Sequence, residues 1–125
     1  MERVYFYTPK AETREKVQAL CGKLGMEFRE LVPADLNRYV GEIVGSETSI
    51  KRPVRPDKAP IFFQMPEIML FYGISDSRLD DFLEAYPKAG IDRISYKAVI
   101  TPFNISWTLY ELALELKREN DQMNR

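Results

Sequence analysis

One pattern of secondary structure occurs twice in this chain, and this repetition constrains the fold more than any other feature. Each copy begins with an apolar strand and continues as a helix, a second strand, a proline, a capping residue and a second helix. A chain of 125 residues is long enough for one domain with a buried core. We therefore expect a single domain, 1–125, that contains an internal repeat at residues 1–45 and 67–120.

The two copies align at an almost constant offset along the chain. Tyr7 corresponds to Tyr72 and Gly25 corresponds to Gly90, so the offset is the same at both positions. Pro33 corresponds to Pro102, where the offset is slightly larger. The second copy is therefore expected to contain four additional residues between its first strand and its proline.

The first copy is expected to start with a strand at Val4–Tyr7. Thr8 is a suitable N-cap for the following helix, and Gly25 is a suitable residue to end it. A second strand is predicted at Met26–Val32, because apolar and polar residues alternate there. A second helix is expected to follow, with Asp35 as its N-cap.

The second copy is expected to start with a strand at Ile68–Tyr72, which is apolar throughout and typical of a strand buried on both faces. Ser75 is the predicted N-cap of the next helix, which is expected to end at Gly90. Alternation then predicts a strand at Ile94–Ile100. The last helix is expected to have Asn104 as its N-cap.

These units predict an α/β fold, in which two tandem βαβα units form one four-stranded, mostly parallel sheet with helices on both faces. The first and third strands are the most apolar, so they are expected at the centre, which gives the order 2-1-3-4. The proline-rich and basic connector at residues 46–66 is long enough to reverse the chain between the copies. A ferredoxin-like α+β fold with an antiparallel sheet is therefore the alternative.

Charge and hydropathy restrict the partners. The chain has 18 basic and 19 acidic residues, whereas a general nucleic-acid binder normally has a basic excess. Its longest apolar run, Ile68–Tyr72, is too short to cross a bilayer, and its first residues do not resemble a secretion signal. The single cysteine cannot form an internal disulfide. We expect a cytoplasmic protein without nucleic-acid or membrane partners.

The sequence contains no histidine, which removes the commonest general base and the commonest transition-metal ligand. Cys21 lies in the apolar stripe of the first predicted helix, so it is expected in the core and not as a nucleophile. No glycine-rich phosphate-binding motif is present. We therefore expect no cofactor, no metal site and no catalytic residue, and a binding protein is favoured over an enzyme.

The most distinctive segment is Lys97–Trp107, with the sequence KAVITPFNISW. Together with Gly73 and the leucine-rich last helix, it resembles a bacterial family known as domain of unknown function 3783. The resemblance covers about residues 67–119 and implies no activity, because the family has none assigned. The first copy shows the same pattern weakly, with Arg38 in place of the tryptophan.

Two hypotheses about function follow from the residues. The first is a small non-enzymatic binding or regulatory module that forms a homodimer through its last helix. There Trp107, Tyr110 and Leu114 form a second apolar stripe, away from the stripe that faces the core. The connector residues Ile61–Phe63 are an alternative cover for this stripe.

The second hypothesis is a small-molecule or anion-binding protein, or a weak enzyme. Its pocket would lie at the carboxyl ends of the strands, where helix N-termini attract anions. A simpler interpretation is that the cap and turn residues there serve only local structure. The candidate ligand-binding residues are Thr8, Lys10, Gly73, Ser75, Lys97, Thr101 and Asn104.

Overall fold

The computed structural model describes residues 1–46 and 58–123, so most of the predicted connector lies outside the described residues. Four strands, four α-helices and one 3₁₀ helix form the described part of the chain. In chain order they are β1 (Arg3–Tyr7), α1 (Ala11–Leu24), β2 (Glu27–Glu30), a 3₁₀ helix (Pro33–Asn37), α2 (Val40–Ile43), β3 (Ile68–Tyr72), α3 (Asp76–Lys88), β4 (Tyr96–Val99) and α4 (Leu109–Met123).

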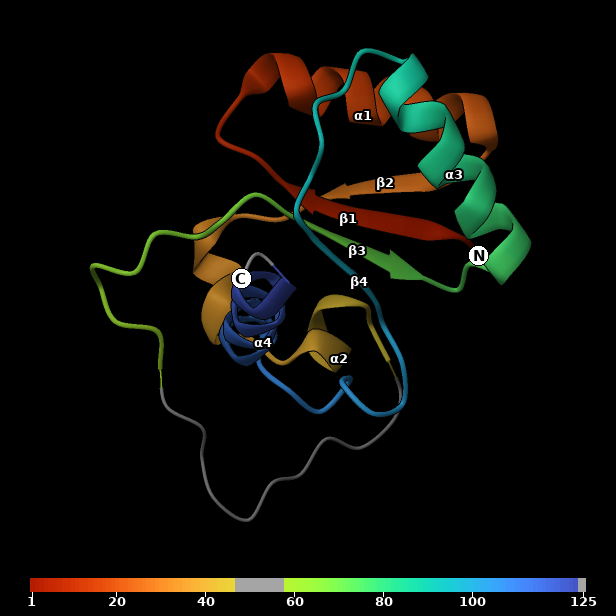
Figure 1. The fold of residues 1–125 in the computed structure, drawn as a ribbon. Helices are drawn as coiled ribbons and strands as arrows, with labels where there is room; N and C mark the ends of the chain where they lie inside the picture. The colour runs from red at the N-terminus through yellow and green to blue at the C-terminus, as the bar shows by residue number, and fades with distance from the viewer. Residues whose placement is uncertain (47–57, 124–125) are drawn as a thin grey trace.

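The strands form one sheet in the order β2-β1-β3-β4, which confirms the predicted order. The outer pairs, β1–β2 and β3–β4, are parallel, whereas the central β1–β3 pair is antiparallel. The sheet is therefore mixed. Helices α1 and α3 cover one face, and α2 and α4 lie on the other, so the predicted three-layer α/β arrangement is confirmed (Figure 1).

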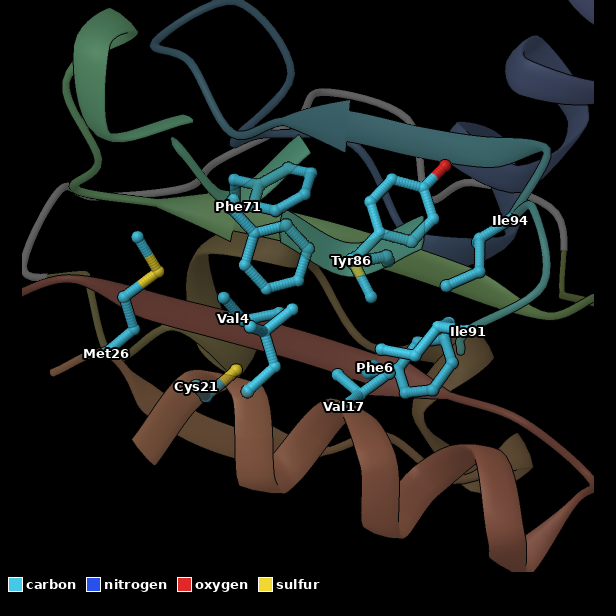
Figure 2. Packing of buried hydrophobic residues seen from close by; sticks show 12 residues of the cluster. Val4, Phe6, Val17, Cys21, Met26, Phe71, Tyr86, Ile91 and Ile94 are labelled. Carbon is cyan, nitrogen blue, oxygen red and sulfur yellow. The ribbon is translucent and has the colours of Figure 1, made fainter. Parts of the chain in front are cut away.

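Each face of the sheet has its own apolar core, because successive side chains of β1 and β3 point to opposite faces. Between the sheet and helices α1 and α3, the rings of Phe71 and Phe82 make an edge-to-face contact with centroids 5.3 Å apart. Figure 2 shows Cys21 of α1 among the side chains of this core, close to Val4. The core on the other face is built around Leu70 and Leu109, with side chains from α2 and α4.

The outer strand pairs repeat the same register. In the first half Arg3 pairs with Glu27, and in the second half Ile68 pairs with Tyr96. Ile68 is the counterpart of Arg3 at the smaller offset seen in the sequence, and Tyr96 is the counterpart of Glu27 at the larger one. The four additional residues therefore fall at 92–95, in the loop that precedes β4.

Where the two halves pair, equivalent residues lie opposite each other. In the antiparallel central pair, Tyr5 pairs with Leu70, which is its own counterpart in the second copy. An isolated antiparallel bridge also joins Tyr39 to Thr108, which is its counterpart at the larger offset. The halves are therefore related by an approximate two-fold axis perpendicular to the sheet.

Two helix starts differ from the sequence-based expectation. Helix α1 begins at Ala11 with Lys10 as its N-cap residue, and Thr8 does not cap it. Helix α4 begins at Leu109, and Thr108 instead of Asn104 precedes it, accepting a hydrogen bond from the Glu111 N–H at 3.1 Å. Ser75 caps α3 as predicted.

The helix predicted to start at Asp35 is interrupted, and Asp35 lies inside a 3₁₀ helix instead of serving as an N-cap. This 3₁₀ helix ends at Asn37, and a separate short helix, α2, begins at Val40. The residues between them pair with the other half. The Arg38 carbonyl accepts a hydrogen bond from the Leu109 N–H at 3.0 Å, and beside it the Val40 N–H donates to the Trp107 carbonyl at 2.8 Å. This bridge takes the place of the helical hydrogen bonds that a continuous helix needs.

The N-terminus closes against the end of β3. Gly73 has a positive φ of 71°, and a Cβ at this position would lie 2.8 Å from the Met1 carbonyl oxygen. Arg78 of α3 forms an ion pair with Glu2 at 3.1 Å and holds this segment in place. Gly25 has a similar φ of 72°, but no atom lies within 4 Å of its added Cβ.

We predict that Gly73→Ala is more destabilising than Gly25→Ala. Both substitutions place a side chain in the left-handed region, which costs about 1–2 kcal/mol. Only Gly73→Ala adds a clash with backbone, which raises the loss by about 1–3 kcal/mol. Urea unfolding measures the free energy of unfolding of both variants. Equal losses would show that the N-terminus moves aside without cost.

Candidate functional site

The antiparallel central pair separates the residues of the predicted pocket. Thr8 follows β1 and Gly73 follows β3, so they lie at opposite ends of the strand pair. Thr8 donates a hydrogen bond from Oγ1 to Glu67 Oε2 at 2.6 Å and accepts one from the Lys10 N–H at 3.2 Å. The expected common pocket at one end of a parallel sheet is therefore not assembled from these residues.

The remaining turn residues are occupied with local structure. The Oγ of Ser75 accepts a hydrogen bond from the Arg78 N–H. Asn104 Oδ1 accepts from the Thr101 N–H at 2.9 Å, and its Nδ2 donates to the Val99 carbonyl at 3.0 Å. Within residues 1–46 and 58–123, no buried side-chain nitrogen or oxygen is left without a hydrogen-bond partner. The simpler interpretation of Asn104 therefore accounts for its contacts.

Lys97 points away from the turn at Thr101. Its ammonium group donates a hydrogen bond to the Ile94 carbonyl and lies 5.7 Å from the centroid of the Tyr86 ring. Both contacts are on the α3 side of the sheet. Lys97 is therefore on the opposite face from the segment that leads to α4.

The predicted interface residues do not form one stripe on α4. Trp107 precedes the helix, and its ring packs against that of Phe103 with centroids 5.5 Å apart. Tyr110 is covered by Phe63 of the connector, with centroids 4.8 Å apart, which is the cover that the sequence offered as an alternative. Leu114 is 41% exposed.

The open edge of β4 is the feature that the sequence analysis did not single out. In the described part of the chain no strand pairs with its outer side. The Ile100 N–H bonds to the Phe71 carbonyl, so the parallel ladder directs the backbone groups of Lys97 and Val99 outward. The Val99 carbonyl already accepts a hydrogen bond from the Nδ2 group of Asn104. The remaining outward groups are the Lys97 N–H and carbonyl and the Val99 N–H.

The opposite edge of the sheet, β2, has a different composition. Its residues Glu27–Glu30 read EFRE, with three charged side chains, whereas the equivalent residues Tyr96–Val99 of β4 read YKAV, with one. Arg3 forms an ion pair with Glu27 at 3.0 Å along the β2 edge. Charged side chains protect sheet edges from pairing with other chains. Of the two equivalent edges, β4 is the less protected.

Two shallow grooves flank β4, one on each face. The α3-side groove, of about 190 Å³, is lined by Phe71, Leu79, Leu83, Lys97, Ala98 and Val99. The aromatic groove, of about 290 Å³, lies between β4 and α4 and is lined by Lys97, Ala98, Phe103, Asn104, Trp107, Leu112, Glu115, Leu116 and Glu119. Phe103 is 76% exposed and Val99 is 40% exposed. The grooves and the strand form one continuous surface.

A comparison of the two edge strands in the sequence would have revealed part of this surface, because only β4 lacks a run of charges. The contribution of Glu115 and Glu119 was not detectable, because it depends on the angle at which α4 crosses the sheet. The position of Trp107 outside the helix depends on the bridge between Tyr39 and Thr108.

Cys21 is fully buried in the core between α1 and the sheet, as expected (Figure 2). Burial raises the pKa of its thiol to about 12. The thiol is therefore protonated at neutral pH and screened from solvent. Among the described residues there is no group of three or more His, Cys, Asp or Glu side chains arranged to hold a metal ion.

Comparison with known families confirms the resemblance seen in the sequence. Residues 67–123 match the family described as a domain of unknown function (DUF3783). The match covers less than half of the chain and contains β3, α3, β4 and α4, and therefore the β4 edge and both grooves. Neither the curated proteins nor the solved structures gave a match. No helix in the described ranges is long and apolar enough to cross a membrane.

The raised pKa of Cys21 predicts a loss of stability in alkaline solution. The folded protein keeps the thiol neutral up to about pH 12, whereas the unfolded chain ionises near pH 9. The stabilisation is therefore complete below pH 9 and is lost progressively between pH 9 and 12. Between pH 8 and 10 this loss amounts to about 1.4 kcal/mol. Urea unfolding of wild type and Cys21→Ala measures it, and parallel pH profiles would contradict the assignment.

Proposed function

We propose that this protein is a non-enzymatic binding module that receives an extended polypeptide segment along the β4 edge. The observation that carries the proposal is the arrangement of an open strand between two grooves on opposite faces of the sheet. An added strand projects successive side chains to opposite faces. Its side chains would therefore enter the two grooves alternately, while its backbone bonds to Lys97 and Val99.

The chemistry of the chain favours binding over catalysis. Histidine is absent from the sequence, and the single thiol is buried with a raised pKa. The hydroxyl and amide groups of Thr101 and Asn104 are committed to hydrogen bonds within their own turn. We place the module in the cytoplasm, where a buried free cysteine is stable.

We also propose that the chain arose by duplication of a βαβα unit. The equal registers of the outer pairs and the pairing of Tyr5 with Leu70 support this origin. After duplication one edge, β2, acquired charges and the other, β4, acquired apolar side chains. The two edges of one fold then differ in what they bind, and β2 serves as an internal control for β4.

Self-association is a second candidate function, and a separate surface favours it. Leu114 of α4 lines a depression with Lys58, Pro60, Tyr110 and Glu111. The neighbouring connector residues Ile61 and Phe62 are almost fully exposed. Exposed apolar side chains gathered in this way are typical of a contact between chains. A homodimer through this surface leaves the β4 edge accessible.

We predict that Val99→Lys abolishes peptide binding and that Glu30→Lys does not. Position 30 of β2 is the counterpart of position 99, so both variants carry a lysine at the same place on equivalent edges. The probe is a displayed library of random dodecamer peptides, selected on the wild-type protein. Fluorescence polarisation then measures the affinity of each enriched peptide for the wild type and both variants.

Enriched peptides should bind the wild type and Glu30→Lys alike, and Val99→Lys at least about tenfold more weakly, because a lysine in the α3-side groove blocks an added strand. Circular dichroism verifies that both variants are folded. Selection that yields no binder, or binders that tolerate Val99→Lys, would refute the proposed function.

For the second candidate we predict that the wild type sediments as a dimer at high micromolar concentration and that Leu114→Lys is a folded monomer. A charge at the centre of an apolar contact removes the favourable burial and adds a desolvation penalty. Val32→Lys is the matched control, because Val32 is a similarly exposed apolar residue elsewhere on the surface. A monomeric wild type would rule out this dimer.

A further inference from the structure

The aromatic groove is lined by both apolar and acidic side chains. Phe103 and Trp107, two of its lining residues, form an edge-to-face pair with ring centroids 5.5 Å apart. Ala98 and Leu116 contribute apolar surface, and Glu115 and Glu119 of α4 contribute carboxylates. The α3-side groove, in contrast, is almost entirely apolar, and its one charged lining residue is Lys97. The two faces of the β4 edge are therefore selective for different side chains.

Of the two carboxylates of this groove, Glu115 is paired with a cation of the chain, and Glu119 has no ion pair in the described part of the chain. The ammonium group of Lys97 is held on the α3 side by the Ile94 carbonyl and the Tyr86 ring. Arg118 forms an ion pair with Glu115, and this contact lowers the pKa of that carboxyl and keeps it ionised. Glu119 adds a second carboxylate on the next turn of the helix. The groove therefore combines aromatic faces with negative charge.

We infer that the polypeptide received at the β4 edge places an arginine side chain in the aromatic groove. Its planar guanidinium stacks on an aromatic face and bonds to a carboxylate at its edge, and the aliphatic stem packs on the apolar side chains of the groove. This inference rests on the proposed function and specifies its partner. The partner segment alternates an apolar residue, an arginine and a second apolar residue, because the flanking residues face the α3-side groove.

The alternatives to an arginine fit the groove less well. An apolar side chain would offer no partner to Glu119 and would displace water from its carboxylate. An acidic side chain would meet like charge. A second copy of this chain, paired through β4 about a two-fold axis perpendicular to the sheet, would bring the two acidic α4 helices to the same face. Charge complementarity therefore favours a separate basic segment.

The test uses Trp107 as its reporter, because it is the single tryptophan of the chain. The probe peptide is acetyl-Thr-Val-Arg-Val-Thr-amide, titrated into the full-length protein while tryptophan emission is recorded. The comparison peptide has citrulline in place of arginine, which keeps the shape and removes the charge. We expect the arginine peptide to change the emission and to bind about tenfold more tightly than the citrulline peptide.

Variants then assign the charge contribution. Glu119→Gln should weaken the arginine peptide and leave the citrulline peptide unchanged. Asp80→Asn, which removes an exposed carboxylate on α3, is the matched control and should alter neither affinity. Added salt should weaken the arginine peptide selectively.

The outcomes separate this inference from the proposed function. If both peptides bind equally and both are lost in Val99→Lys, the edge receives a strand but the arginine is not recognised, which overturns the inference alone. If the arginine peptide binds equally to wild type and Val99→Lys, the groove recognises the cation but no strand is added, which overturns the proposed function.

No change in Trp107 emission with the arginine peptide overturns the inference. A concentration-dependent emission change without peptide identifies a second copy as the occupant and overturns it too.

Discussion

The antiparallel pairing of β1 with β3 determines the rest of the structure. Because Tyr5 pairs with its own counterpart Leu70, the two βα units are related by a two-fold axis through the centre of the sheet. This arrangement sends the carboxyl ends of β1 and β3 to opposite ends of the molecule. It therefore divides the predicted pocket and leaves two equivalent strands, β2 and β4, as the only strands of the described sheet with an open side.

Much of the fold was predictable, because it depends on local pattern. The uniformly apolar residues of β1 and β3 placed both strands at the centre, and Gly90 and Ser75 marked the ends of α3 correctly. The direction of β3 relative to β1 was not predictable, because it depends on the path of a connector whose composition allows either orientation. The candidate pocket was predicted for parallel β1 and β3. Because these strands are antiparallel, its residues lie at opposite ends of the strand pair.

The site was harder to predict than the fold, because the position of Trp107 depends on contacts between the halves. Because hydrogen bonds join Val40 to Trp107 and Leu109 to Arg38, α4 begins only at Leu109 and Trp107 lies outside the helix. Periodicity assumes a continuous helix, so it assigned Trp107 to the same stripe as Leu114. Of the four predicted N-caps only Ser75 caps its helix. Asn104 bonds within its own turn, but that turn precedes α4.

The two edges of the sheet differ in how they are protected from pairing with other chains. A sheet with two apolar edges would add further copies without limit, because each added chain would present a new edge. The charges of β2 prevent this at one side. At the other side the Nδ2 group of Asn104 donates a hydrogen bond to the Val99 carbonyl. Asp35, the counterpart of Asn104 in the first half, has no amide group and cannot donate to Glu30. The β4 edge therefore offers only a short set of backbone groups. Under the proposed function, this would limit pairing to a short segment and make recognition depend on the side chains that enter the two grooves.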